Sequence, residues 1–417
     1  MNMFSFFLNH CVVNIQNLIY SLCLIYKSST MINFRFIRFW MSRNLLRTSS
    51  MGFSIFFMWE IVVKYHSVFL VSLIPTFSLL GYLIITLPIG YVLDKVNKSK
   101  VIFLFSVMTV LVYFLLIFVQ SLIYIYAVDF LSFMLYMGSG DAYYSSIKEI
   151  VSEDLSGAMS LNTVGRAGSG IAGTALGGSV AYFDPASLPF ILVVMALVAA
   201  SLSFPFKSVS SKDSTIYSFS HVSKVIKLIL PLLLMGLLIN GAFTAIDVYS
   251  SGLFHLILHV NAIYYTAFLM AFSIGELLGG VVGGRIKVLK EGLVSSLISL
   301  FGLSFILISI TREPLVDVLL SLLVGIGTSL VNIPLDTLLT SLIPNKMMGR
   351  TNSIIQIFLL SSSPVMATLY GILATLFGII NVLFAVGVFG ILMGIPSFFV
   401  IKKFKGMKEE DVQKFIA

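Results

Sequence analysis

The sequence predicts an all-α membrane protein with twelve transmembrane helices, arranged as two pseudo-symmetric halves of six helices each. Of its 417 residues, 58% are hydrophobic and only 11% are charged, and the mean hydropathy is +1.03. A soluble domain usually carries about 25% charged residues. Apolar runs of roughly 20 residues, long enough to cross a bilayer, follow one another with short breaks. Lipid offers the backbone no hydrogen-bond partners, so each run is expected to be helical.

Each expected span ends where polar residues, glycine or proline interrupt the apolar run. In chain order the spans are residues 43–63, 68–92, 101–119, 122–147, 157–182, 186–206, 225–250, 260–284, 292–311, 315–341, 350–376 and 379–401.

The segment between the sixth and seventh spans, 207–224, is serine-rich and charged and is expected to link the two halves. The halves would then occupy 35–206 and 225–401, with a tail at 402–417. Residues 1–34 are expected to be an N-terminal extension, with a possible non-native start. The apolar patch within it is short for a span, and no basic residue precedes that patch.

The distribution of positive charge predicts the orientation. Every lysine and arginine except Lys64, Arg166 and Arg312 falls at the termini or in loops on one side of the expected spans. Positively charged loops stay in the cytoplasm, so both termini are expected to be cytoplasmic in a multi-pass protein of the plasma or inner membrane. The net charge of +8 is therefore explained by membrane orientation and not by nucleic-acid binding.

Two similar segments close the second and eighth spans, and such a repeat indicates two half-domains that enclose a substrate path. The first copy contains Gly90, Asp94, Lys95, Asn97, Lys98 and Lys100, and the second contains Gly280, Gly284, Arg285, Lys287 and Lys290. Each copy ends an apolar run with a glycine, a turn and a cluster of cations.

These segments resemble the loop between helices 2 and 3 of the major facilitator superfamily, G-x-x-x-D-R/K-x-G-R/K-x-R/K. Asn97 replaces its second glycine, and Gly284 replaces the aspartate in the second copy. The fifth span resembles the antiporter motif G-P-x-x-G-G through Gly173, Gly177 and Gly178, with threonine in place of proline. The start of span 11, at Arg350, also matches a pattern of the family, and the arginine motif expected in span 4 of drug antiporters is missing.

The resemblance covers about residues 35–401 and implies a monomeric transporter that works by alternating access. The cationic loops and Arg350 would gate it, with Asp94 near the start of span 11. The three glycines of span 5 would allow close helix packing.

Ionisable residues inside apolar spans are the candidate coupling and substrate-binding groups, because charges at membrane depth usually face a cavity or a partner. Seven fall within the expected spans: Glu60, Asp129, Asp141, Arg166, Asp247, Glu276 and Asp336.

Some of the seven have plainer explanations. Glu60 lies one helical turn before Lys64 and can form a hydrated ion pair with it. Asp141 and Asp336 lie near the cytoplasmic ends of their spans, where a solvated helix-end contact explains them at least as well as substrate binding. Arg166 and Glu276 lie at a similar depth, about 12–14 Å from the cytoplasmic ends of their spans. These two spans are adjoining helices in the resembled fold. The two charged residues are expected either to pair or to face the cavity separately.

Glu60 and Asp247 occupy corresponding positions near the outer ends of spans 1 and 7. If they approach each other, the two carboxylates cannot both ionise easily, so one would hold a proton and couple transport to pH. In the alternative, Lys64 neutralises Glu60 and Asp247 is simply hydrated; Asp129 is then the next coupling candidate.

Several other classes of function are disfavoured. The sequence Gly168-Ser-Gly170-Ile-Ala-Gly173 matches a dinucleotide pattern but lies in a membrane span that follows no strand. His255 and His259 have a spacing that suits a metal, but no third ligand is evident, so no metal and no cofactor are expected. None of the five histidines lies in a span, which argues against a hydrolytic enzyme.

The sequence therefore predicts a secondary active transporter that moves a small hydrophobic or amphipathic solute, by proton-coupled efflux. The apolar cavity helices favour this substrate class: span 1 carries Phe53, Phe56, Phe57 and Trp59, and span 4 carries Tyr136. Uptake by proton symport is the alternative direction. A receptor-like protein that binds but does not transport is the alternative of another class.

Overall fold

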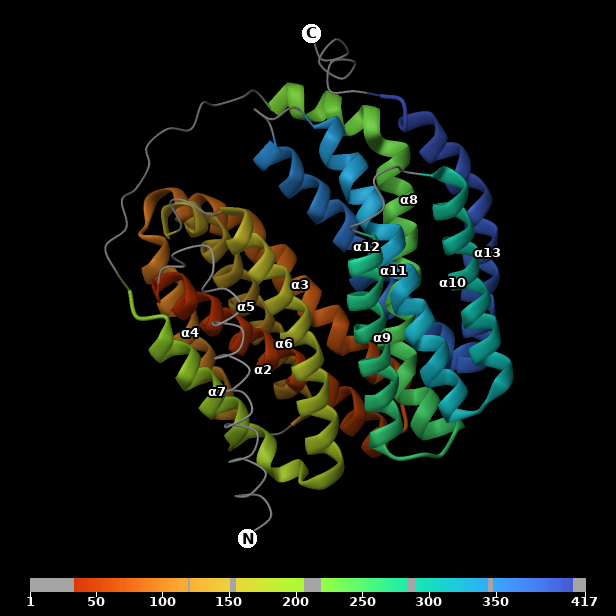
Figure 1. The fold of residues 1–417 in the computed structure, drawn as a ribbon. Helices are drawn as coiled ribbons and strands as arrows, with labels where there is room; N and C mark the ends of the chain where they lie inside the picture. Colours follow the sequence, from red (N-terminus) through yellow and green to blue (C-terminus); the bar gives the residue numbers. More distant parts are fainter. Residues whose placement is uncertain are drawn as a thin grey trace.

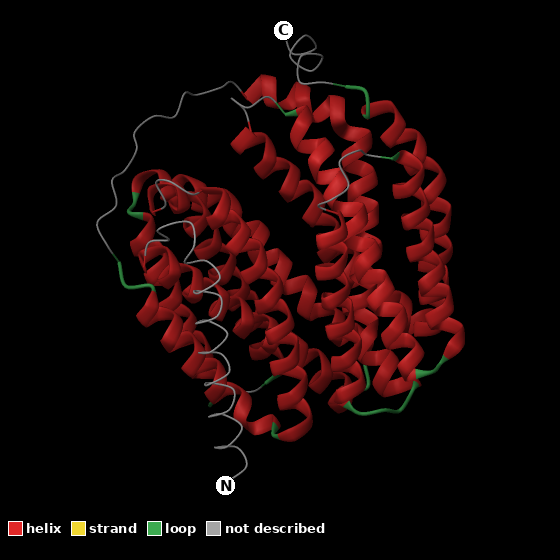
Figure 2. Ribbon diagram, viewed as in Figure 1, coloured by secondary structure: helices red, strands yellow, loops and turns green. Residues whose placement is uncertain are grey.

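The computed structural model describes residues 34–118, 121–150, 155–205, 219–283, 290–343 and 348–407. These residues are helical and include no strand (Figure 2). The long α-helices among them form two bundles of six, which lie side by side (Figure 1).

The first half contains α2 (Phe34–Tyr65), α3 (Val68–Lys95), α4 (Lys98–Leu116), α5 (Leu122–Ile150), α6 (Leu155–Phe183) and α7 (Leu188–Leu202). The second contains α8 (Phe219–Gly252), α9 (Ala262–Gly283), α10 (Glu291–Thr311), α11 (Pro314–Leu342), α12 (Met348–Phe377) and α13 (Ile379–Phe404). A π-helical turn, η2 (Leu253–Ile257), follows α8, and a 3₁₀ turn, η1 (Pro185–Ser187), precedes α7.

Ten segments of the described residues are long and apolar enough to cross a membrane. The segments α2 and α6 are not among them, because α2 carries several arginines and α6 is rich in glycine and serine. These two helices pack along each other inside the first half. Their polar residues are thus kept within the bundle, where they are available for a function.

Several helix ends differ from the expected spans, and three helices extend beyond them in the following ways. The helix α2 begins at Phe34 and not at residue 43, α8 begins at Phe219 inside the expected linker, and α13 continues to Phe404. Hydropathy finds the part of a helix that lies in lipid, whereas arginine and lysine are good helix formers and let the helix continue beyond it. Residues 1–33 and 206–218 lie outside the described residues, and they include nearly all of the expected extension 1–34 and most of the expected linker 207–224.

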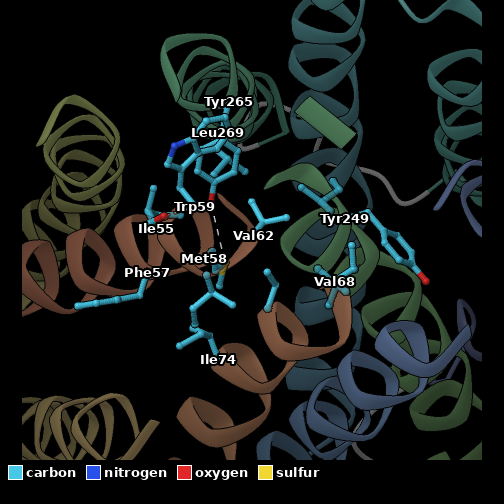
Figure 3. Packing of buried hydrophobic residues seen from close by; sticks show 14 of the residues in the cluster. Ile55, Phe57, Met58, Trp59, Val62, Val68, Ile74, Tyr249, Tyr265 and Leu269 are labelled. Carbon is cyan, nitrogen blue, oxygen red and sulfur yellow. Dashed lines mark hydrogen bonds between the residues drawn. The ribbon is translucent and has the colours of Figure 1, made fainter. Parts of the chain in front are cut away.

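One hydrophobic core is shared by the two halves. It lies at the end of the molecule where α8 passes into α9, which we call the closed end; the opposite end, where α7 ends and α8 begins, is the linker end. Trp59 of α2 stacks on Tyr265 of α9 with ring centroids 5.4 Å apart (Figure 3). The Tyr265 hydroxyl also donates a hydrogen bond to the carbonyl oxygen of Ile55, at 3.4 Å. These contacts join the halves at the closed end.

At the linker end each half has a core of its own. The core of the first half includes Phe39 and Tyr143, and the core of the second half includes Leu232 and Phe404. The ribbons of the two halves diverge toward this end (Figure 1). The molecule is therefore joined at the closed end and parted at the linker end.

Candidate functional site

Five charged side chains lie along the boundary between the halves, at different depths between the closed end and the linker end. The first half contributes two arginines and the second half contributes three carboxylates: Arg47 (α2), Arg166 (α6), Asp247 (α8), Glu276 (α9) and Asp336 (α11). All are exposed except Arg47, which is partly buried. We call these five residues the charged cluster.

Electrostatic interactions within the charged cluster cross the boundary between the halves. Arg166 is close enough to interact with both Glu276 and Asp336, and Arg47 also interacts with Glu276. Within the described residues, no direct ion pair or hydrogen bond joins these arginines to these carboxylates. Groups of opposite charge in the described part of the chain thus lie within electrostatic range across the boundary without forming a direct ion pair.

Asp247 shows that an accessible space reaches deep into the molecule. It is exposed, although every other residue from 244 to 254 is buried. A side chain that faced lipid would have exposed neighbours one turn away on the same helix face. Asp247 interacts electrostatically with Glu276 and with the buried Tyr265. It therefore faces an internal, accessible space, and its charged neighbour there has the same sign.

The arginines of α2 are positioned by α5. Arg47 Nη1 donates a hydrogen bond to the hydroxyl of Tyr136, at 3.3 Å. Arg43, one turn earlier, has its guanidinium carbon 4.2 Å from the ring centroid of Tyr144, a cation–π contact. A Cβ at Gly140 would lie 2.5 Å from Arg43 Nη1, so a larger residue there would displace the end of the Arg43 side chain. The result is a cationic helix face supported by aromatic rings.

Sequence reasoning missed Arg43 and Arg47 as interior charges. Both fall in the first five residues of the expected span 43–63, where cations are typical of the cytoplasmic membrane boundary. Their spacing of four residues, which places both on one helix face, was the available signal. With α2 beginning at Phe34, Arg47 lies about 20 Å along the helix.

The remaining predicted charges lie apart from the charged cluster. Asp129 is buried within the first half and accepts hydrogen bonds from Ser54 Oγ at 3.0 Å and from Ser78 Oγ at 2.5 Å. Asp141 interacts electrostatically with Arg43, and Glu60 with Lys64. Neither a hydrogen bond nor an ion pair joins Glu60 to Asp247 among the described residues.

The aromatic rings of α2 belong mainly to the packed core, and Trp59 also lines a cavity at the closed end. Phe53, Phe56, Phe57 and Trp59 are all buried in the core shared by the halves. Figure 3 shows Phe57 and Trp59 within this packing. The burial of Phe53, Phe56 and Phe57 therefore gives no support to a hydrophobic solute site at these residues.

The gating residues expected from sequence lie near helix ends, and the side chains of several of them are not described. Gly90, Asp94 and Lys95 fall in the last turns of α3, and Lys98 and Lys100 fall in the first turn of α4. The side chains of Asp94, Lys95 and Arg350 are not described, and residues 284–289, which include Arg285, are outside the described residues. Gly280 lies in α9 with open space around it.

The glycines of α6 hold it close to both halves. A Cβ at Gly173 would lie 2.6 Å from Cβ of Met51 in α2, and a Cβ at Gly177 would overlap the carbonyl oxygen of Gly52. Gly178 packs in the same way against Thr266 of α9, across the boundary. Arg166 is carried by this closely packed helix, so the glycines fix its position.

Replacing Gly177 by alanine is expected to lower the melting temperature of the purified protein. The added methyl group meets backbone, which cannot move aside, and overpacking of this kind costs about 1–3 kcal/mol. Gly168→Ala in the same helix is the matched control, because no atom lies within 4 Å of a Cβ at that position. Equal melting temperatures for the two variants would contradict the proposed close packing of α2 on α6.

Comparison with known proteins decides the family. The family model described as Major Facilitator Superfamily matches residues 39–368. The chain belongs to the major facilitator superfamily. It is thus a transporter-family membrane protein and not an enzyme. Comparison with curated protein sequences finds no match to this chain.

Solved structures of superfamily transporters share this fold. A bacterial homologue of the human lysosomal transporter Spinster, inward-facing and unoccupied, matches with a TM-score of 0.74 and 13% identity, covering 90% of this chain and 98% of that one. The nucleoside transporter NupG matches with a TM-score of 0.70 and 11% identity, covering 88% and 99%. A POT family transporter in complex with 5-aminolevulinic acid matches with a TM-score of 0.69 and 11% identity, covering 89% and 96%.

Proposed function

We propose that the protein is a secondary active transporter that exports a small organic solute in exchange for protons, by alternating access. The charged cluster is the observation that carries this proposal. It lies on the boundary between the halves, so a rocking motion of one half against the other would change its contacts and its access to water. Superfamily membership supports transport as the activity.

The division of charge supports an amphipathic solute that carries both a negative and a positive group. Arg47 and Arg166 come from the first half, and the three carboxylates come from the second half. A carboxylate or phosphate group of the solute would bind the arginine side, where guanidinium groups offer paired donors. Its ammonium group would bind Glu276 or Asp336. Such a solute would bridge the halves and favour their approach.

The count of charges supports coupling to protons. The charged cluster holds two cations and three carboxylates, and Asp247 is the carboxylate whose charged neighbour is another carboxylate, Glu276. One proton would remove this excess negative charge. A cation of the solute and a proton would then compete for the same negative site, which is the requirement for exchange.

Flux measurements in proteoliposomes test the function. Amino acids, small amines, carboxylates and uncharged apolar compounds would be compared, with and without a pH gradient. We expect flux of a solute that carries both charges, driven against its gradient by protons moving the opposite way. Co-directional movement of protons would identify uptake, flux of uncharged compounds alone would contradict the solute class, and binding without flux would identify a receptor.

We further propose that the linker end is cytoplasmic and that the membrane is the plasma or inner membrane. The distribution of lysine and arginine supports this orientation. The structure, parted at the linker end, then corresponds to an inward-facing state.

Replacing Asp94 by asparagine is expected to slow transport without preventing insertion. A carboxylate near the start of a neighbouring helix is stabilised by the exposed amides and the helix dipole, typically by 0.3–1 kcal/mol. Losing this contact would change the balance between the two access states. The measurement is initial flux at equal amounts of reconstituted protein, with Glu60→Gln as the control carboxylate change. Wild-type flux for Asp94→Asn would remove its gating role.

A further inference from the structure

A second polar site lies at the closed end, apart from the charged cluster. It is a cavity of about 530 Å³ whose lining includes three histidines, His66, His255 and His259. His66 connects α2 to α3 in the first half, whereas His255 lies in η2 and His259 precedes α9 in the second half. Imidazole rings from both halves therefore share one cavity at the end where the halves are joined.

The rings of His66 and His255 are in contact across the boundary. Their centroids are 5.8 Å apart and their planes are inclined by only 7°, so the rings lie nearly parallel in an offset stack. His255 also packs edge-on against Trp59, with centroids 5.4 Å apart. His66 and His259 both have left-handed backbone conformations, with φ of 49° and 53°, which are costly for residues with a Cβ. The surrounding structure thus holds these two turns in place.

Among the described residues, the charges around this cavity include no carboxylate that acts on His255. The ionisable groups that act on it are His66 and His259. Glu60 interacts instead with Lys64, and Asp247 with Glu276. Other ionisable residues near this end include Lys64, Tyr65, Tyr182, Asp184, Tyr264 and Tyr265, and Arg312, Glu313 and Asp317 lie around the turn from α10 to α11. A proton on His255 would therefore meet another imidazole and no neutralising carboxylate.

We propose that the three-histidine cavity is a proton-binding site whose protonation opens the closed end. Imidazole is the side chain whose charge ordinarily changes between pH 5 and 8. Neutral rings can stack across the boundary, but two charged rings on opposite halves repel each other. Opening that end separates them and relieves the repulsion. Lower pH on that side of the membrane therefore favours the open state.

The proton is favoured over a metal ion as the ligand. The described residues hold no group of three or more histidine, cysteine, aspartate or glutamate side chains arranged to bind a metal. The proposal requires that the two ends open alternately, but it depends neither on the identity of the solute nor on proton binding at Asp247.

A cysteine at Thr266 tests the proposal. Thr266 is buried at the closed end, where Gly178 of the other half packs on it. Its labelling by a membrane-impermeant thiol reagent would therefore report opening. Cys11 and Cys23, the natural cysteines, would be replaced by serine. Labelling rates of Thr266→Cys would be measured in proteoliposomes at about pH 7.5 and about pH 5.5, on either side of the centre of the imidazole range. They would be divided by the rates of Asp184→Cys, an exposed position after α6.

The normalised rate is expected to rise about tenfold on acidification. This is the size of effect expected when two charged imidazole rings at this separation repel each other and solvent weakens the repulsion. His66→Gln and His255→Gln, alone or together, should remove most of this rise, whereas His221→Gln in α8 should leave it unchanged. A pH dependence that persists in the double histidine variant would overturn the proposal and would assign the effect to another group, such as Asp247. The absence of any pH dependence in the wild-type background would overturn it as well.

Discussion

Replacing Asp247 by asparagine is expected to uncouple transport from the pH gradient. Asparagine resembles the protonated carboxyl group in shape and lacks charge, so the variant can bind solute but cannot exchange a proton at this site. Uphill transport driven by a pH gradient should fall by at least about tenfold. A tenfold change corresponds to roughly 1.4 kcal/mol of free energy. Exchange of labelled for unlabelled solute, which needs no net proton movement, should continue.

The matched control for this experiment is Glu60→Gln. Glu60 is also a carboxylate of a boundary helix, but Lys64 interacts with it and it lies apart from the charged cluster. The control variant should keep the wild-type dependence on the pH gradient. If Asp247→Asn keeps it too, Asp247 does not carry the coupling, and the buried Asp129 becomes the next group to replace.

Replacing either Arg166 or Glu276 alone is expected to reduce transport more than replacing both. Arg166→Gln leaves Glu276 and Asp336 without their shared cation, and Glu276→Gln leaves Arg166 with one carboxylate fewer. A charge left without its partner in a confined space is costly. Each single variant should lose about tenfold or more in flux, and the double variant should recover part of that loss. This corresponds to a coupling energy of about 0.5–3 kcal/mol.

A double-mutant cycle measures this coupling, with melting temperature as a second readout. Arg166→Gln combined with Glu60→Gln provides the control cycle, because the two groups show no mutual interaction. The effects in that cycle should simply add. Additive effects for Arg166 and Glu276 as well would show that the two act separately, each on the solute.

Much of the fold could be predicted from the sequence, because lipid leaves the chain few alternatives. Apolar length and interrupting residues located the membrane helices, and the repeated loops and α6 glycines pointed to the family. Helix ends such as Phe34 could not be found in the same way. Hydropathy changes at the edge of the lipid, and a helix with arginines can continue past it.

The site was only partly predictable. Arg166 and Glu276 stood out because each is a single charge in an apolar helix, and their depth suggested proximity. Asp247 also stood out, but sequence reasoning paired it with Glu60, whereas the structure places it beside Glu276. The rotation of each helix about its own axis decides which residues face one another. The few polar residues in an apolar span do not fix that rotation. The contact between His66 and His255 joins loops of different halves, so only the packing of the halves reveals it.

The single core at the closed end and the two separate cores at the linker end give the conformational cycle a thermal signature. Opening the closed end removes apolar side chains such as Trp59 and Tyr265 from their packing, and closing the linker end would bury other surface. Unless the two areas match, the heat capacities of the access states differ. The proportion of the two states would then vary nonlinearly with temperature. A curved Arrhenius plot of transport, in lipid that undergoes no phase transition over the same range, would measure that mismatch.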